Sequence, residues 1–456
     1  MERHDVIVVG GGPAGANAGR AAATHGADVL VVEQGIPRED RDDLGPDSTD
    51  AAGMLDYWVD IMELDPAEIP EEIILQELDS TEFIGPHERV TLTTTGMDAT
   101  YDKFGFTFHR ARMDDWMRER AEEAGASYVV GRSVKRVETD LNGSPQHVIE
   151  LADGEALGAD AVILSDGPQR RITLQVLERF LPEGHDILER MAPTNANHIA
   201  YQEYRRFPAE AFEPTVLKFW WGYIPGETAY PWVFPNDDPV ARVGLTMPIG
   251  MDLRDFDDPT SYVLIEEDDD AIPNGATYID RLLRREYGDR YDIDEDFPRV
   301  PDRGKRAGVE TYAISSTRPI DSPVEANIAI TGGAMGTTSA FHEGGYHVAT
   351  RSGSVAGRLA AKGELDRYNH AWKEAIGDEI LRNVTFADLV EGYTPADWDR
   401  AFATANRMKG SSDDRLVERI WTAGIPAIKL FFAYRWRKRG YRNGRYVQLT
   451  EDEYVY

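Results

Sequence analysis

Three glycines near the start of the chain have the spacing of a dinucleotide cradle. Gly10, Gly12 and Gly15 follow the apolar run DVIVV in G-x-G-x-x-G order, and Glu33 closes a second apolar run, ADVLVVE. In such a unit the first glycine makes a tight turn, the second lets a pyrophosphate approach the backbone, and the third lets a helix pack on the strand. The N-terminus of that helix then faces the phosphates, while the acid accepts a hydrogen bond from a ribose hydroxyl. The pattern predicts dinucleotide binding.

A second strand–glycine–helix unit lies far along the chain. The apolar run ANIAIT, residues 326–331, leads into Gly332 and Gly333, and a helix of small residues is expected from about Gly345 to Ala361. Between the two units, the apolar run AVIL ends at Asp166-Gly167 and predicts another buried strand. These glycine-rich segments (Gly10 to Gly15, Asp166-Gly167 and Gly332-Gly333), here called the glycine hinges, are expected to meet around one ligand.

A short aromatic stretch, YPWVFP at residues 230–235, stands out in an otherwise acidic chain. Side chains alternate along a strand, so Tyr230, Trp232 and Phe234 are expected on one face, with flanking prolines stiffening the backbone. Each ring buries about 150–250 Å² with few rotatable bonds. The stretch is therefore either a rigid wall for an apolar ligand or simply the core of a second domain.

The charge balance is strongly acidic, with 81 Asp and Glu against 49 Lys and Arg and a net charge of −32. Only nine residues are lysine. An acidic coat of this kind keeps a protein hydrated in concentrated salt, where repulsion is screened. We expect the cytoplasmic protein of an extreme halophile, the alternative being an acidic protein of an ordinary mesophile. Nucleic acid is not expected as a partner, because phosphate would be repelled.

The 456 residues contain no cysteine, which excludes disulfides, thiolate nucleophiles and Cys-ligated metal centres, and no metal site is expected. No signal peptide is expected before the first strand, and no apolar run reaches the ~20 residues of a membrane span. The segment 429–445, KLFFAYRWRKRGYRNGR, combines seven basic residues with several aromatic ones and no acid. It predicts either peripheral contact with an anionic membrane face or a basic helix packed on the acidic body.

Four landmarks in this order resemble the FAD-dependent flavoproteins of the hydroxylase type: the first glycine unit with its acid, the segment RARMD at 110–114, Asp166-Gly167, and the late glycine-rich unit. Within that group, YPWVFPNDDPVARVGLT is similar to the Y-x-W-x-F-P…V-G-x-G motif of the geranylgeranyl reductase family. The resemblance covers roughly residues 1–360. It implies an enzyme that uses FAD to saturate the double bonds of isoprenoid chains, such as those of archaeal lipids.

The resemblance also implies which residues bind the cofactor. Ala14 and Glu33 would contact the ADP half of FAD, Val134 the adenine, and Gly333 the ribityl chain. Arg110 would lie over the cofactor, and the start of the last glycine-rich helix would approach the flavin ring. The implied cofactor residues are Gly10, Gly12, Ala14, Gly15, Glu33, Gly45, Arg110, Val134, Asp166, Gly167, Gly332, Gly333, Gly344, Gly345 and Tyr346.

Other positions are assigned to substrate and catalysis. The implied substrate pocket consists of Tyr230, Trp232, Phe234, Pro235 and Gly244. His342 and Glu343 are candidates for the proton donor, although His342 also suits a loop histidine that caps the next helix. Arg110 has an alternative role too, an ion pair with Asp114 one helical turn away.

The chain departs from the family pattern at several positions. The G-D-A motif appears as Gly332-Gly333-Ala334, so the carboxylate expected near the ribityl chain is missing. The G-E-G motif appears as Glu343-Gly344-Gly345, and Thr246 replaces the last glycine of V-G-x-G. The early cysteine of many relatives is also absent.

The predicted fold class is α/β, with a discontinuous Rossmann-like FAD domain containing a mixed sheet, an α+β substrate domain with an antiparallel sheet, and a C-terminal helical region. Alternative functions are a FAD-dependent monooxygenase, a quinone-linked dehydrogenase, or a non-catalytic protein that binds flavin or prenyl lipid. The electron donor stays open between a ferredoxin and NAD(P)H. The predicted ranges are 1–80, 101–175 and 300–363 for the FAD domain, 81–100 and 176–299 for the substrate domain, and 364–456 for the C-terminal region.

Overall fold

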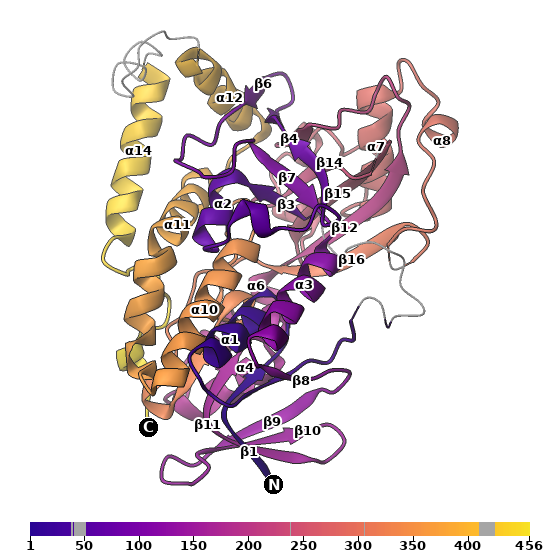
Figure 1. Cartoon of the computed structure of the whole chain (residues 1–456). Coiled ribbons are helices and arrows are strands. Elements are labelled where there is room, and N and C mark those ends of the chain that lie inside the picture. Colours follow the sequence, from indigo (N-terminus) through magenta and orange to yellow (C-terminus); the bar gives the residue numbers. More distant parts are fainter. Residues whose placement is uncertain (38–39, 41–51, 238, 305, 410–424) are drawn as a thin grey trace.

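A computed structural model describes residues 1–37, 40, 52–237, 239–304, 306–409 and 425–456. Within these residues the strands form three sheets, and the predicted mixture of sheets and helices is confirmed (Figure 1). The first sheet has the order β8-β2-β1-β11-β10-β9, and β17 pairs with β11 beside it. Its strands are β1 (Glu2–Val9), β2 (Val29–Val32), β8 (Ser127–Val129), β9 (Val134–Thr139), β10 (His147–Leu151), β11 (Ala156–Leu164) and β17 (Ile328–Ile330).

The first sheet is mixed, as predicted. Strands β8, β2, β1, β11 and β17 run parallel, whereas β9 and β10 form an antiparallel extension. Val6 to Val9 and Val29 to Val32 are buried, as is typical of parallel strands covered on both faces. Both glycine units predicted from sequence therefore belong to this sheet, because β1 and β17 each pair with β11.

Two helices of the glycine units pack closely together (Figure 1). They are α1 (Pro13–Thr24) and α10 (Tyr346–Lys362), and α10 matches the helix expected from sequence. A Cβ atom on Gly353 would lie 1.9 Å from the carbonyl oxygen of Ala14, and one on Gly357 would lie 2.0 Å from that of Ala18. Glycine therefore allows the two helix backbones to touch at these positions.

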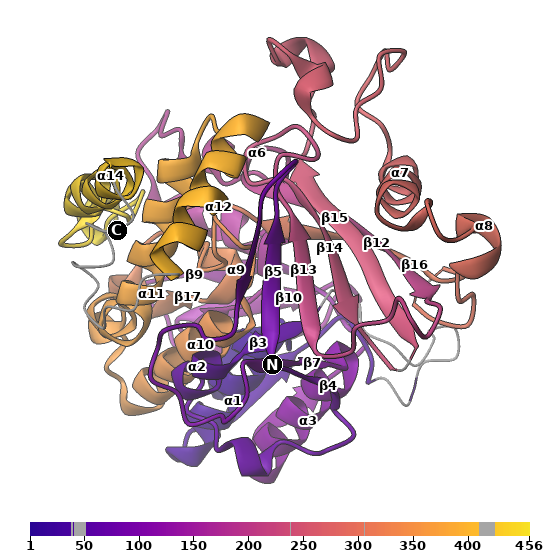
Figure 2. The ribbon, with the colours of Figure 1, turned by 90° about the horizontal axis from the view of Figure 1, so that it is seen from above.

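The second sheet carries the aromatic stretch. Its order is β16-β12-β15-β14-β13-β5-β6, antiparallel except between β13 and β5. Figure 2 shows α7 on one side of it and α12 on the other. Its strands are β5 (Ser80–Ile84), β6 (Arg89–Leu92), β12 (Asn197–Arg206), β13 (Val216–Trp220), β14 (Tyr230–Pro235), β15 (Val240–Pro248) and β16 (Val309–Ser315).

One strand of the second sheet comes from a segment that the sequence analysis assigned to the cofactor part. β16 falls within 300–363 but pairs with β12. The sheets therefore divide the chain after β16 rather than at residue 300, and the functional division into domains stays a proposal. A third, small sheet contains β3 (Gly53–Leu55), β4 (Ile74–Leu78) and β7 (Gly105–Phe108).

The remaining helices surround these sheets. None of the helices in the described part of the chain is both long and apolar enough to cross a bilayer. The helices are α2 (Asp56–Ile61), α3 (Arg110–Glu123), α4 (Arg171–Phe180), α5 (Ile187–Arg190), α6 (Pro193–Ala196), α7 (Gly275–Tyr287), α8 (Ile293–Asp296), α9 (Gly332–Met335), α11 (Tyr368–Val390), α12 (Pro395–Lys409) and α14 (Ile425–Tyr441).

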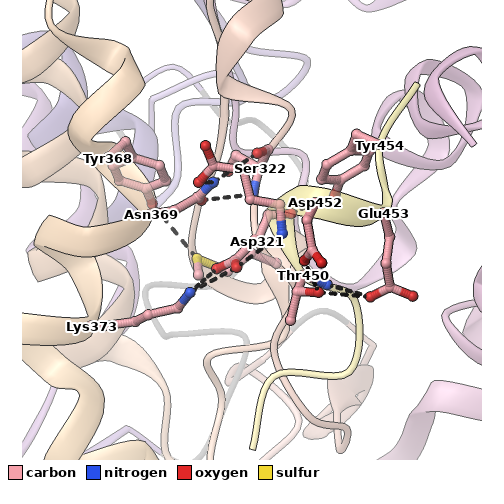
Figure 3. Close-up of polar contacts among 11 residues, drawn as sticks. Asp321, Ser322, Tyr368, Asn369, Lys373, Thr450, Asp452, Glu453 and Tyr454 are labelled. Carbon is pink, nitrogen blue, oxygen red and sulfur yellow. Dashed lines mark hydrogen bonds and ion pairs between the residues drawn. The ribbon is translucent and has the colours of Figure 1, made fainter. Parts of the chain in front are cut away.

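The last residues of the chain return to the first sheet and fasten the C-terminal region to it (Figure 3). Lys373 of α11 donates to the buried carboxylate of Asp321 at 2.7 Å. The hydroxyl of Tyr454 donates to the carbonyl oxygen of the same residue at 2.5 Å. Asn369 accepts from the backbone N–H of Ser322 and donates to Glu451. The C-terminal segment is thus an integral part of the core around β17.

Candidate active site

The three glycine hinges converge at one end of the first sheet. A Cβ atom on Gly10 would lie 2.5 Å from the carbonyl oxygen of Ser165, next to Asp166-Gly167. One on Gly332 would lie 2.9 Å from the Cβ of Ala14, and one on Gly333 would lie 3.3 Å from the nitrogen of Pro168. Gly10 and Gly332 also have φ values of +96° and +58°, in the region that favours glycine. The predicted meeting of the hinges is confirmed.

Two helix N-termini at the hinges are left open for an anion. Gly12 caps α1 and Gly345 caps α10; neither cap has a side-chain hydrogen bond, and neither first turn has an acidic residue. The first N–H groups of a helix lack partners within the helix and carry partial positive charge. A Cβ on Gly12 would meet nothing within 4 Å, so the backbone there is accessible. These features fit the pyrophosphate of a dinucleotide.

Glu33 lies at the end of β2, beside the first hinge. Its Oε2 accepts from the N–H of Gly11 at 2.5 Å, and its Oε1 accepts from the N–H of Gly35 at 2.6 Å. The segment leading to Val134, the first residue of β9, runs alongside it, because the N–H of Arg132 donates to the carbonyl oxygen of Glu33. The predicted ribose and adenine positions are therefore neighbours. Gly45, predicted with them, lies outside the described residues.

Arg110 forms the ion pair with Asp114 that was its alternative role, and it also contacts Tyr346. Its Nε donates to both carboxylate oxygens of Asp114 at 2.9 Å, which is the ion pair within α3. Its guanidinium also lies 4.9 Å from the ring centre of Tyr346, the first residue of α10. The Tyr346 hydroxyl donates to Asp114 at 3.1 Å. These contacts fasten α3 to the head of α10.

The carboxylate of Asp166 has a structural partner. It accepts hydrogen bonds from the N–H groups of Ile172 at 2.7 Å and Thr173 at 3.1 Å, at the start of α4. A carboxylate is stabilised at a helix N-terminus by the helix dipole. At this landmark Gly167, with φ of +69°, offers an accessible backbone, because a Cβ there would meet nothing within 4 Å.

Arg170 is central to the hinges, and the sequence analysis did not identify it. The side chain is fully buried and donates to the carbonyl oxygens of Gly333 at 2.9 Å and Ala334 at 3.1 Å. It also donates to Pro168 and to Asn197 of β12, and contacts Ser315 of β16. Burial lowers the pKa of Arg170 to about 10, while Asp166 raises it, so the guanidinium stays charged at pH 7. No motif signals this role, since only the fold brings these acceptors together.

The rings of the aromatic stretch, here called the ring wall (Tyr230, Trp232 and Phe234), lie on one face of β14. They share a buried cluster, whereas Val233 belongs to the cluster on the other face, so the predicted alternation is confirmed. All six residues of β14, including Pro235, are buried, so the rings do form part of a core. Trp221 and Trp398 lie in the same cluster. An apolar channel along the ring wall stays a proposal.

Gly244 allows the ring wall to lie flat on the sheet. It is paired directly with Trp232 across β14 and β15. A Cβ atom at this position would lie 2.5 Å from the Trp232 indole ring, so any larger residue would displace the indole. This observation explains physically why a glycine accompanies the aromatic motif.

The ring wall contacts the hinge turn, residues 339–345, which precede α10. The Tyr230 hydroxyl donates to the carbonyl oxygen of His342 at 2.8 Å. Burial and the charge of Glu343 raise the pKa of Tyr230 well above its usual value, so its proton stays in place. The aromatic face and the last glycine hinge, distant in sequence, therefore meet directly.

His342 hydrogen-bonds within the hinge turn and not to the first turn of α10, so the predicted helix cap is not formed. Its Nδ1 accepts from the N–H of Gly344 at 3.1 Å. Trp58 of α2 stacks on it with ring centres 5.2 Å apart, and on His347 of α10 with centres 4.1 Å apart. Burial lowers the pKa of His342 and of His347 to about 3, so both rings are neutral at pH 7.

Glu343, the other candidate proton donor, also lies in the hinge turn. Its φ is +58°, and its Oε1 contacts Nδ1 of His198 on β12. The sequence analysis did not identify His198, because nothing in its surroundings in the sequence marks it. The structure therefore brings together the hinge turn, the ring wall and two strands of the second sheet.

Comparison with known proteins agrees with this geometry. Residues 5–165, which include both strands of the first glycine unit, match the family described as FAD dependent oxidoreductase. The chain is a flavin-dependent oxidoreductase. The open helix N-termini, the glycine contacts and Glu33 fit its FAD, as predicted.

The wider comparison concerns the whole chain. It is 23% identical to a digeranylgeranylglycerophospholipid reductase of Methanocaldococcus jannaschii, over 94% of this chain and 97% of that protein. A geranylgeranyl bacteriochlorophyll reductase-like structure from Thermoplasma acidophilum superposes with a TM-score of 0.69 at 20% identity, covering 95% of this chain and 100% of the other. A flavin-dependent brominase gives 0.60 at 14% identity, with 96% and 99% covered. The predicted resemblance to geranylgeranyl reductases is confirmed.

Proposed function

We propose that this flavin-dependent oxidoreductase reduces the carbon–carbon double bonds of prenyl chains in lipids. The observation that carries the proposal is the hydrogen bond from Tyr230 to His342, because it joins an aromatic wall to the hinge turn at the head of α10. A prenyl chain offers almost no polar group, so its site must be apolar and rigid. The ring wall supplies such a surface next to the converging glycine hinges.

Each part of the site has a defined task in this proposal. Bound FAD, once reduced, supplies hydride. Gly12 and Gly345 present helix N–H groups to its polar portions, and Glu33 accepts from the ribose. Arg110 and Asp114 hold Tyr346 at the flavin end. The ring wall keeps the double bond at reacting distance and excludes water.

Anaerobic absorption spectroscopy tests the proposal. The FAD-loaded protein is reduced with dithionite and mixed with a geranylgeranyl glycerophospholipid or with its fully saturated counterpart. We expect the flavin to be reoxidised by the unsaturated lipid alone. Reoxidation that requires oxygen, with formation of a hydroxylated or halogenated product, would instead favour the chemistry of the brominase neighbour or of a monooxygenase.

We further propose that α14 contacts an anionic membrane face. Phe432 and Trp436 are 62% and 75% exposed, one helical turn apart, on a segment with seven basic residues and no acid. Aromatic rings enter the interface, and each basic residue contributes about 1 kcal/mol near anionic lipid. The electron donor, a ferredoxin or NAD(P)H, also stays a proposal.

Liposome flotation in dilute salt checks the membrane contact. The double variant F432S/W436S is expected to lose at least half of its flotation with anionic vesicles, whereas L141S, which alters an exposed leucine in another part of the chain, floats like the wild type. Truncation before residue 429 is a poor test, because it also removes the segment that contacts Asp321. Equal flotation of wild type and double variant would contradict the contact.

A further inference from the structure

A buried histidine and a buried glutamate meet where the ring wall joins the hinge turn. His198 lies on β12 and Glu343 lies just before the glycines that open α10. Nδ1 of His198 contacts Oε1 of Glu343, and the two side chains retain only 10% and 2% of their exposure. The contact links the second sheet to the segment that we assign to the flavin.

Glu343 occupies an unfavourable position. Its backbone is in the left-handed region, which glycine adopts without strain, and its carboxylate is buried. Among the described residues, neither carboxylate oxygen accepts a regular hydrogen bond, so His198 is its ion-pair partner. Strained backbone and buried charge persist where they serve a function. A glycine at this position would avoid both the backbone strain and the burial of a carboxylate, yet the residue is a glutamate.

His198 lies beside the ring wall. Side chains alternate along β12, so His198 and Ala200 lie on the same face of the sheet. Ala200 packs in the cluster that contains Tyr230 and Trp232, and Thr246 pairs with both Ala200 and Tyr230 across β15. The pair therefore lies between the apolar wall and the hinge turn.

We propose that His198, held by its contact with Glu343, is the acid that protonates the prenyl double bond. This inference rests on the proposed function. Saturation of one double bond adds two hydrogens. One carbon would receive a hydride with its electron pair from reduced flavin. The other carbon would receive a proton, and the two π electrons would form the new C–H bond to it. His198 would give up its proton and then regain one from water, while bound FAD would supply the hydride with its electron pair. Glu343 is the positioning residue that stabilises the charged ring.

Other acids near the hinge turn are less suited to this step. Tyr230 retains its proton, and His342 and His347 are neutral at pH 7. Two further titratable groups lie near the pair: Glu227, whose pKa is raised chiefly by burial and lowered by His198, and Tyr312 near Tyr230. His198 has the buried carboxylate of Glu343 directly against its ring.

The pairing has a test that does not depend on activity. In protein with isotope-labelled histidine, NMR is used to follow the titration of His198, assigned by its loss in H198N. We expect E343Q to lower the midpoint of His198 by about one pH unit or more, because an opposite charge is removed. The matched control is E374Q, which alters the exposed His370–Glu374 pair and should leave His198 unchanged. An unchanged midpoint in E343Q would overturn the pairing.

The catalytic role is tested in a single turnover of the FAD-loaded protein with a geranylgeranyl lipid. H198N should slow saturation about 10²–10⁴-fold, as expected for loss of a general acid, and E343Q should slow it less and displace the pH profile to lower pH. FAD content and reduction by dithionite should match the wild type, which shows that the variants fold. E374Q should turn over at the normal rate.

The outcomes separate this inference from the proposed function. If H198N and E343Q both turn over as fast as the wild type, the acid role is overturned and the proposed function stands. A wild type that retains FAD but saturates no prenyl chain would overturn the proposed function and, with it, the acid role.

Discussion

Single buried polar residues hold the hinges in position. Arg170 joins the loop after β11, the turn into α9 and two strands of the second sheet, with several carbonyl oxygens as acceptors. A buried charged group of this kind is costly to truncate, because its partners are left without donors. Arg170 thus contributes to the site without being expected to touch the cofactor.

Replacement of Arg170 provides the residue-scale prediction. R170M should lower the free energy of unfolding by about 3–5 kcal/mol and weaken FAD binding, because buried carbonyl oxygens lose their donors. R254M, which alters an exposed ion pair with Asp252, should leave both quantities unchanged. Denaturant unfolding and titration with FAD measure them. A stable R170M with normal FAD affinity would contradict the assigned role.

At this scale the sequence predicted backbone requirements better than side-chain partners. The glycines and Glu33 follow a local pattern, so their positions were predictable. The approach of His198 to Glu343 and the contacts of Arg170 with Gly333 and Ala334 join distant segments of the chain. No local pattern encodes such contacts.

At the scale of elements, the packing of α1 on α10 aligns the two open helix N-termini. Gly357 allows this contact, whereas Gly440 of α14 has open space around it. G357A should therefore lower the free energy of unfolding by about 1–3 kcal/mol and weaken FAD binding, because the helices must separate. G440A should raise stability by up to about 1 kcal/mol, because alanine favours a helix. Thermal and chemical unfolding measure the change in stability of each variant. A G357A protein as stable as the wild type would contradict the close contact.

The stack of Trp58 on His347 gives a second prediction at this scale. Burial lowers the pKa of His347 to about 3, whereas a histidine in an unfolded chain has a pKa of about 6.5. The unfolded chain therefore takes up a proton first, and stability falls as the pH drops from 6.5 towards 3, by about 1.4 kcal/mol per pH unit. H347F, which keeps the stack, should reduce the stability lost between pH 7 and pH 5 by about 2 kcal/mol. Urea unfolding at both pH values measures it; an equal loss in H347F and wild type would contradict the buried neutral ring.

The helices and strands themselves were largely predictable from local patterns. The expected helix at 345–361 is α10, and the expected alternation at 230–235 is β14. The pairing of β16 with β12 was not predictable, since pairing partners are set by the sheet as a whole. The same holds for the C-terminal segment that contacts Asp321.

At the scale of the whole molecule, the net charge of −32 governs the response to salt. We propose that the protein is halophilic. The Debye length falls from about 10 Å at 0.1 M to about 3 Å at 1 M, so repulsion between surface carboxylates is screened. The melting temperature should therefore rise steadily between 0.1 and 3 M KCl, and more than in sucrose of equal osmolarity. A melting temperature that is constant or falls with KCl would contradict the proposal.

We propose that a flavin held at the converging glycine hinges faces an aromatic wall that positions a prenyl chain. Mass spectrometry of a geranylgeranyl lipid, incubated without oxygen with the reduced FAD-loaded protein, tests that claim most directly. We expect the lipid to gain two hydrogens for each double bond as the flavin becomes oxidised. A lipid of unchanged mass beside flavin that stays reduced would contradict the account.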